Sequence, residues 1–134
     1  MTKKELAIAK HDMKFNCCQA VACAFSEEIG VDEQILFTAG EGFGLGMGGT
    51  EGTCGALSGA IMLGGFKNSD RNIENPGTKA ETYKLSKEMV SRFKAKTGGT
   101  ICKDLKGLET GTPLCSCPDC ICKGVEVVEE VLGL

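Results

Sequence analysis

The chain contains no tryptophan, and it has one tyrosine and one histidine in 134 residues. Its net charge is -3, and no tract of basic residues alternates with aromatic ones. Proteins that bind nucleic acid usually carry a basic surface with aromatic side chains for stacking. We therefore expect no nucleic-acid partner.

Long hydrophobic runs are also missing. The longest apolar stretch, from Cys54 to Phe66, is shorter than a membrane span and is rich in glycine. The first residues, MTKKELAIAKHDMK, lack the apolar core of a secretion signal. We expect a cytoplasmic protein that does not cross a membrane.

No segment alternates polar and apolar residues as a strand does, and no repeat divides the chain. The pattern predicts one domain over residues 1–134, an all-α bundle of about five to seven helices. Tyr83, Val90 and Phe93 are expected on the inner face of the longest one. The helices are expected at 2–14, 16–29, 32–39, 54–63, 76–96, 100–105 and 118–132.

A glycine-rich passage, 40–49, precedes the most apolar helix. Glycine loses much backbone freedom when it is ordered, so neither helix nor strand is expected in this passage. No strand precedes it and no Gly-Lys-Ser/Thr follows, which argues against a nucleotide-binding loop. The next helix is apolar on nearly every face and should lie at the centre of the fold. Gly55 and Gly59, four residues apart, would let another helix approach it closely.

What the chain has in excess is cysteine, nine residues in all. In a reducing cytosol, clustered cysteines are more often metal ligands or reactive thiols than permanent disulfides. An odd number also leaves at least one thiol unpaired. The cysteines are therefore the expected centre of function.

Several cysteines fall where helices are predicted to begin. Cys17, Cys54 and Cys120 lie in first turns, and Cys102 opens a short helix. The positive end of a helix dipole favours a thiolate, which is the reactive form of cysteine. Cys18 and Cys23 fit instead the role of small core residues.

Four cysteines form a run, C-x-C-x-x-C-x-C, just before the last helix. Its central CxxC can act as a dithiol switch, in which one thiolate attacks and the other resolves. It can equally be half of a zinc or iron–sulfur site. His11 is expected on the solvent side of its helix. The candidate metal ligands are Cys17, Cys54, Cys102, Cys115, Cys117, Cys120 and Cys122.

Two segments resemble a known family: Asn16-Cys17-Cys18-Gln19-Ala20, and the hexapeptide Cys54-Gly-Ala-Leu-Ser-Gly59 after the glycine-rich passage. They look like the C_GCAxxG_C_C family of redox-active proteins. The resemblance implies four functional cysteines. Cys17, Cys54 and Cys102 match three of them, and Cys120 or Cys122 matches the fourth.

Three functions follow as hypotheses. The first is thiol–disulfide or electron-transfer chemistry by Cys17, Cys54, Cys102 and Cys120, with an unknown redox partner and possible action as a thiol-dependent oxidoreductase. The second is a thiolate metal protein holding zinc or an iron–sulfur cluster, with Gly55 and Gly59 beside the cofactor. The third is an adaptor beside a transporter, which rests on the resemblance alone. A homodimer is compatible with the glycine-lined helix.

Overall fold

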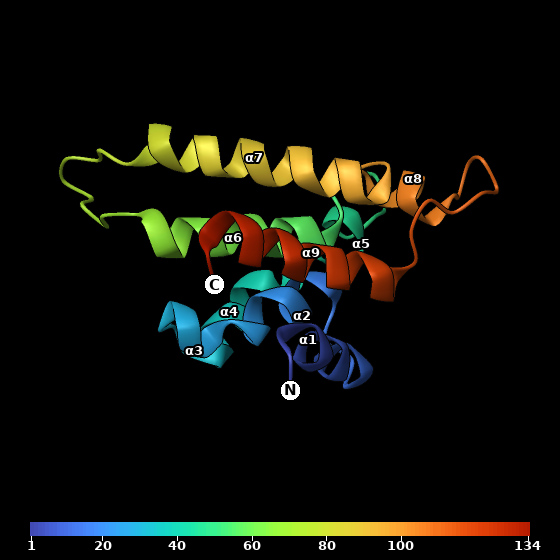
Figure 1. Cartoon of the computed structure of the whole chain (residues 1–134), viewed down its shortest axis with the longest axis horizontal. Helices are drawn as coiled ribbons and strands as arrows, with labels where there is room; N and C mark the ends of the chain where they lie inside the picture. The colour runs from blue at the N-terminus through green and yellow to red at the C-terminus, as the bar shows by residue number, and fades with distance from the viewer.

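Helix α6 (Gly55–Asn68) lies in the middle of the bundle, and the other long helices pack around it (Figure 1). The computed structural model describes all 134 residues. Seven residues of α6 are buried, and four of these are glycine or alanine in its first two turns: Gly55, Ala56, Gly59 and Ala60. The predicted buried central helix is therefore confirmed, and so is the all-α fold, although the chain forms more helices than the five to seven expected.

Helix α2 (Cys17–Ala24) crosses α6 at very short range, because α6 presents glycine there. A β-carbon on Gly59 would lie 2.7 Å from the carbonyl oxygen of Cys18. A β-carbon on Gly55 would lie 3.1 Å from the backbone nitrogen of the same residue. The close approach expected of these two glycines is thus present, and α2 is its partner.

The predicted helix at 16–29 is divided into α2 and α3 (Ser26–Ile29). At Phe25 the backbone leaves helical geometry (φ -108°, ψ 16°) and its N–H bonds to Ala22 O at 3.2 Å, a tightened turn. Neither proline nor glycine marks this break, so the sequence pattern did not reveal it. Helix α1 (Lys3–Asp12) precedes α2, and α4 (Glu33–Gly40) follows α3.

Helices α7 (Lys79–Thr97) and α9 (Cys117–Leu132) run along α6 and cover it (Figure 1). Ion pairs join them, with Lys96 Nζ 2.8 Å from a Glu130 carboxylate oxygen. The predicted inner face of α7 is wrong in part. Phe93 is buried, but Tyr83 is 66% exposed and Val90 37% exposed, and Met89 takes the inner position instead. Because α7 is covered on one face only, its amphipathic register decides which side chains reach the core.

The glycine-rich passage contains short helical turns that the sequence did not predict, η1 (Glu41–Phe43) and α5 (Gly44–Met47). Four consecutive residues, Leu45 to Gly48, have positive φ angles between 55° and 84°. We call residues 45–48 the left-handed turn. Non-glycine residues adopt this conformation only at a cost of about 1–2 kcal/mol each, so the surrounding fold must hold the turn in place.

Backbone hydrogen bonds tie the left-handed turn to α8 (Cys102–Lys106). Gly52 N donates to Gly46 O at 3.0 Å, and Cys102 N donates to Gly52 O at 2.9 Å. A β-carbon on Gly46 would collide with the side chain of Cys102. The helices share one hydrophobic core of 22 buried residues. No helix is both long enough and apolar enough to cross a membrane.

Candidate functional site

A cavity of about 220 Å³ lies where α2, α6, α8 and α9 begin, beside the left-handed turn. Cysteine is the most frequent residue among those that line it, since five of the nine cysteines do so. They come from four helix starts that are far apart in the sequence. The cysteines are Cys17, Cys54, Cys102, Cys117 and Cys120, and the other lining residues are His11, Asn16, Leu45, Gly46, Gly55 and Lys106.

Local sequence signals place these helix starts. Asn16 and Gln19 form a reciprocal capping box, so α2 begins at Cys17. Ser116 accepts a hydrogen bond from Asp119 N at 3.2 Å, so α9 begins at Cys117. Cys54 is the N-cap residue of α6, and Cys102 is the first residue of α8. The predicted placement of thiols at helix starts is therefore present at all four segments.

Cys54 and Cys120 form the first thiol pair. The neighbouring Cys120 thiol lowers the pKa of Cys54 to about 7 against the opposing effect of burial. The N–H dipoles of Ala56 and Leu57 and the charge of Lys106 act in the same direction. These N–H groups fall short of regular capping hydrogen bonds, so the Cys120 thiol is the main cause. The same contact, together with burial, raises the pKa of Cys120.

Cys17 and Cys117 form the second pair, and Lys106 joins it. The Lys106 ammonium donates to the Cys117 sulfur at 3.3 Å. Burial raises the pKa of Cys17 to about 12, and the neighbouring sulfurs of Cys117 and Cys54 add to that effect. Cys17 therefore stays protonated, while the Cys117 sulfur accepts the hydrogen bond from Lys106.

Cys102 lies against the left-handed turn, and burial raises its pKa. Cys115 lies next to Cys120, whose thiol is 3.8 Å from the Cys115 carbonyl oxygen. Cys122 is on another face of α9, in a separate hollow with Lys4 and Ile8 of α1. Of the two residues that match the family's fourth cysteine, the structure brings Cys120 and not Cys122 to the other three.

Comparison with protein families gives one match. A family model described as "Putative redox-active protein (C_GCAxxG_C_C)" matches residues 15–131, which is most of the chain. The chain belongs to the C_GCAxxG_C_C family. Among curated proteins and solved structures, none matches the chain. The C_GCAxxG_C_C match spans all four helix starts that form the cavity.

Two residues of this C_GCAxxG_C_C site were missed or misplaced by sequence reasoning. Lys106 was not singled out, although it stands four residues after Cys102 and hence on the same side of α8. His11 was expected on the solvent side, but it is partly buried and lines the cavity, with Nδ1 3.0 Å from Phe15 O. The position of His11 at the cavity depends on how α1 packs beside α2, which the sequence pattern does not reveal.

Of the other residues considered from the sequence, one lines the cavity and the rest contribute to packing. Gly55 lines the cavity, whereas Gly59 lies under the backbone of Cys18 and does not line it. Cys18 and Cys23 are buried in the packing of α2, as expected of small core residues. No group of three or more His, Cys, Asp or Glu side chains is arranged to hold a metal ion. The thiols therefore do not form a ready-made metal site.

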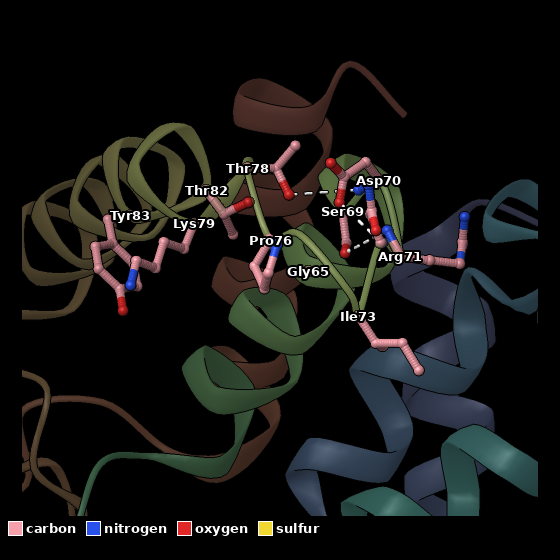
Figure 2. Close-up of a pocket in the computed structure, with 11 residues that line it drawn as sticks. Gly65, Ser69, Asp70, Arg71, Ile73, Pro76, Thr78, Lys79, Thr82 and Tyr83 are labelled. Carbon is pink, nitrogen blue, oxygen red and sulfur yellow. Dashed lines mark hydrogen bonds between the residues drawn. The ribbon is translucent and has the colours of Figure 1, made fainter.

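A second cavity, of about 350 Å³, lies in the loop between α6 and α7 (Figure 2). Its polar groups bond to one another: Asp70 N donates to Thr78 Oγ1 at 3.3 Å, and Arg71 N donates to Ser69 Oγ at 3.1 Å. The Arg71 guanidinium donates to Phe66 O at 3.0 Å. No cysteine lines this cavity, and its hydrogen bonds stabilise the loop itself.

Proposed function

We propose that the protein carries out thiol–disulfide exchange, with Cys54 as the attacking thiolate and Cys120 as the resolving thiol. The observation that carries the proposal is that Cys54 and Cys120 line one cavity at the start of α6, where the Cys120 thiol lowers the pKa of Cys54. It supports a thiolate on Cys54 near neutral pH and holds the second sulfur next to the first. A reactive thiol with a resolving neighbour is the arrangement that disulfide exchange requires.

Atoms, protons and electrons balance in this exchange without any further group. The Cys54 thiolate attacks one sulfur of a substrate disulfide, which forms a mixed disulfide and releases a substrate thiolate. Cys120 gives its proton to that thiolate and attacks the Cys54 sulfur, which forms the Cys54–Cys120 disulfide and releases the second substrate thiolate. Two electrons pass from the protein to the substrate, and an external dithiol returns the protein to its reduced state by the reverse exchange.

Disulfide mapping tests this proposal directly. The reduced protein is treated with one equivalent of a small disulfide, the remaining thiols are alkylated, and the peptides are identified by mass. We expect a Cys54–Cys120 disulfide that is lost in both Cys54→Ser and Cys120→Ser. Cys23→Ser is the matched control, since Cys23 is buried and lies outside the cavity. Oxidation that leaves Cys54 reduced would contradict the proposal.

Metal binding is the second candidate, because five thiols line one cavity and thiolates are the usual ligands of zinc and iron–sulfur clusters. The present arrangement does not fit an ion, so binding would require the cysteine side chains to turn toward a common point. Anaerobic purification followed by metal analysis separates the candidates. Stoichiometric zinc or iron together with thiols that resist alkylation would favour metal binding.

A further inference from the structure

The thiol cavity contains a cationic group and no acidic one. Lys106 lines it, and none of the other ten lining residues is aspartate or glutamate. This is a local departure from the net charge of the chain, which is -3. Of the acidic groups near α8, Glu51 and Glu109 pair with Lys103 at 3.1 Å and 2.8 Å, and Asp104 is exposed and does not line the cavity. The charge in the cavity is therefore not cancelled by a carboxylate.

Lys106 also has bonding capacity to spare. Its ammonium carries three N–H donors, and its hydrogen bond within the protein goes to the Cys117 sulfur at 3.3 Å. The sulfur of Cys117 above all, and those of Cys102 and Cys17, raise the pKa of Lys106 against the opposing effect of burial. The ammonium thus stands beside the sulfurs, with donors left for a ligand.

Two further features limit the charge and the size of a ligand that the cavity can accept. The starts of α2, α6 and α9 surround the cavity, and their dipoles direct positive ends toward it. The volume of about 220 Å³ is below the roughly 300–1,000 Å³ of pockets that hold drug-sized molecules. A small molecule with a negative charge near its reacting atom fits this space.

We propose that the cavity accepts small anionic thiol-reactive substrates, such as carboxylate-bearing disulfides, and that Lys106 is the residue that selects them. The inference deepens the proposed function and rests on it for the identity of the attacking sulfur. Lys106 binds the negative group, and the exchange at sulfur proceeds as described above, with the released substrate thiolate taking the Cys120 proton.

A pair of alkylating probes tests this selection. Iodoacetate and iodoacetamide attack the same thiolate, lose the same iodide and differ mainly in the charge of the group next to the reacting carbon. A change in the fraction of thiolate alters both second-order rate constants by the same factor, so it cancels in their ratio. We expect Lys106→Met to lower the iodoacetate-to-iodoacetamide ratio at Cys54 about fivefold, as the loss of one nearby charge predicts, and Lys106→Arg to retain it.

Lys103→Met is the matched control. Lys103 is on the same helix, but its charge is paired with Glu51 and Glu109 outside the cavity, so the ratio should stay at the wild-type value. An unchanged ratio in Lys106→Met that is folded by circular dichroism would overturn the inference. If Cys54 proves unreactive, the proposed exchange fails, and the same ratio read on Cys117 still decides whether Lys106 selects anions.

Discussion

At the scale of single residues, the chemistry depends on small differences in the surroundings of identical side chains. Cys54 has its pKa lowered to about 7, while burial raises the pKa of Cys18 to about 12. Both thiols are buried beside the α2–α6 contact. The difference is that the neighbouring Cys120 thiol lowers the pKa of Cys54, so the placement of that neighbour decides which of the two thiols has the lower pKa.

We predict that one thiol alkylates with a rate that rises through an apparent pKa of about 7 in the wild type, and that Cys54→Ser removes this fast phase. In Cys120→Ala, the inflection should move upward by about one pH unit, because Cys54 loses the neighbouring thiol donor that lowers its pKa most. The measurement is the pH profile of alkylation with peptide identification. A profile in Cys120→Ala that matches the wild type would show that the donor is not the cause.

The sequence indicated four of the five cavity cysteines as redox thiols, because they fall at predicted helix starts and match the four cysteines of the family pattern. It could not distinguish Cys120 from Cys122. Both stand near the start of α9, and which of them faces α6 depends on the rotation of that helix in the bundle. Lys106 had a local signal, its spacing of four residues from Cys102 on α8, whereas the contribution of His11 depends on how α1 packs in the bundle and has no local signal.

At the scale of elements, the α2–α6 contact sets the geometry of the site. Gly59 lies one turn after Cys54 and Gly55 on α6, and it lets the backbones of α2 and α6 approach each other. The hexapeptide indicated that a helix would approach there, but the break of the preceding helix at Phe25 was not foreseen. It arises from a local tightening around a buried ring rather than from a breaker residue.

We predict that Gly59→Ala lowers the free energy of unfolding by about 1–3 kcal/mol, because its β-carbon would lie 2.7 Å from Cys18 O. Gly65→Ala is the control on the same helix, since a β-carbon there meets nothing within 4 Å. It should leave stability unchanged or raise it by about 0.5–1 kcal/mol. Urea denaturation measures both. Equal effects of the two substitutions would contradict a close helix contact at Gly59.

At the scale of the whole molecule, the buried thiols link stability to pH. The pKa of Cys17, Cys18 and Cys23 is raised from 9.0 to about 12, 12 and 11. Between pH 9 and these values, the folded state keeps protons that the unfolded state has lost. Their contribution is therefore fully present below pH 9 and is lost as the pH rises. Cys54 acts oppositely, since its contribution is present above pH 9 and is lost as the pH falls to about 7.

We predict that the free energy of unfolding decreases from pH 9 to pH 11, and that the decrease is shallower in the Cys18→Ala and Cys23→Ala variants. Denaturant titrations at fixed ionic strength across this range provide the measurement. The slope, rather than the absolute stability, is compared, because removing a buried sulfur also changes packing. A slope that is the same in the wild type and both variants would contradict the linkage.

One consequence concerns helix α9, which supplies a sulfur to each thiol pair. Cys117 and Cys120 are three residues apart on it, and their partners Cys17 and Cys54 belong to helices that pack tightly together. A bond in either pair would anchor the start of α9 and raise the effective concentration of the remaining two sulfurs toward each other. If both pairs form disulfides in the proposed exchange, the second oxidation would follow the first more readily, and the protein would store reducing equivalents cooperatively, four electrons at a time.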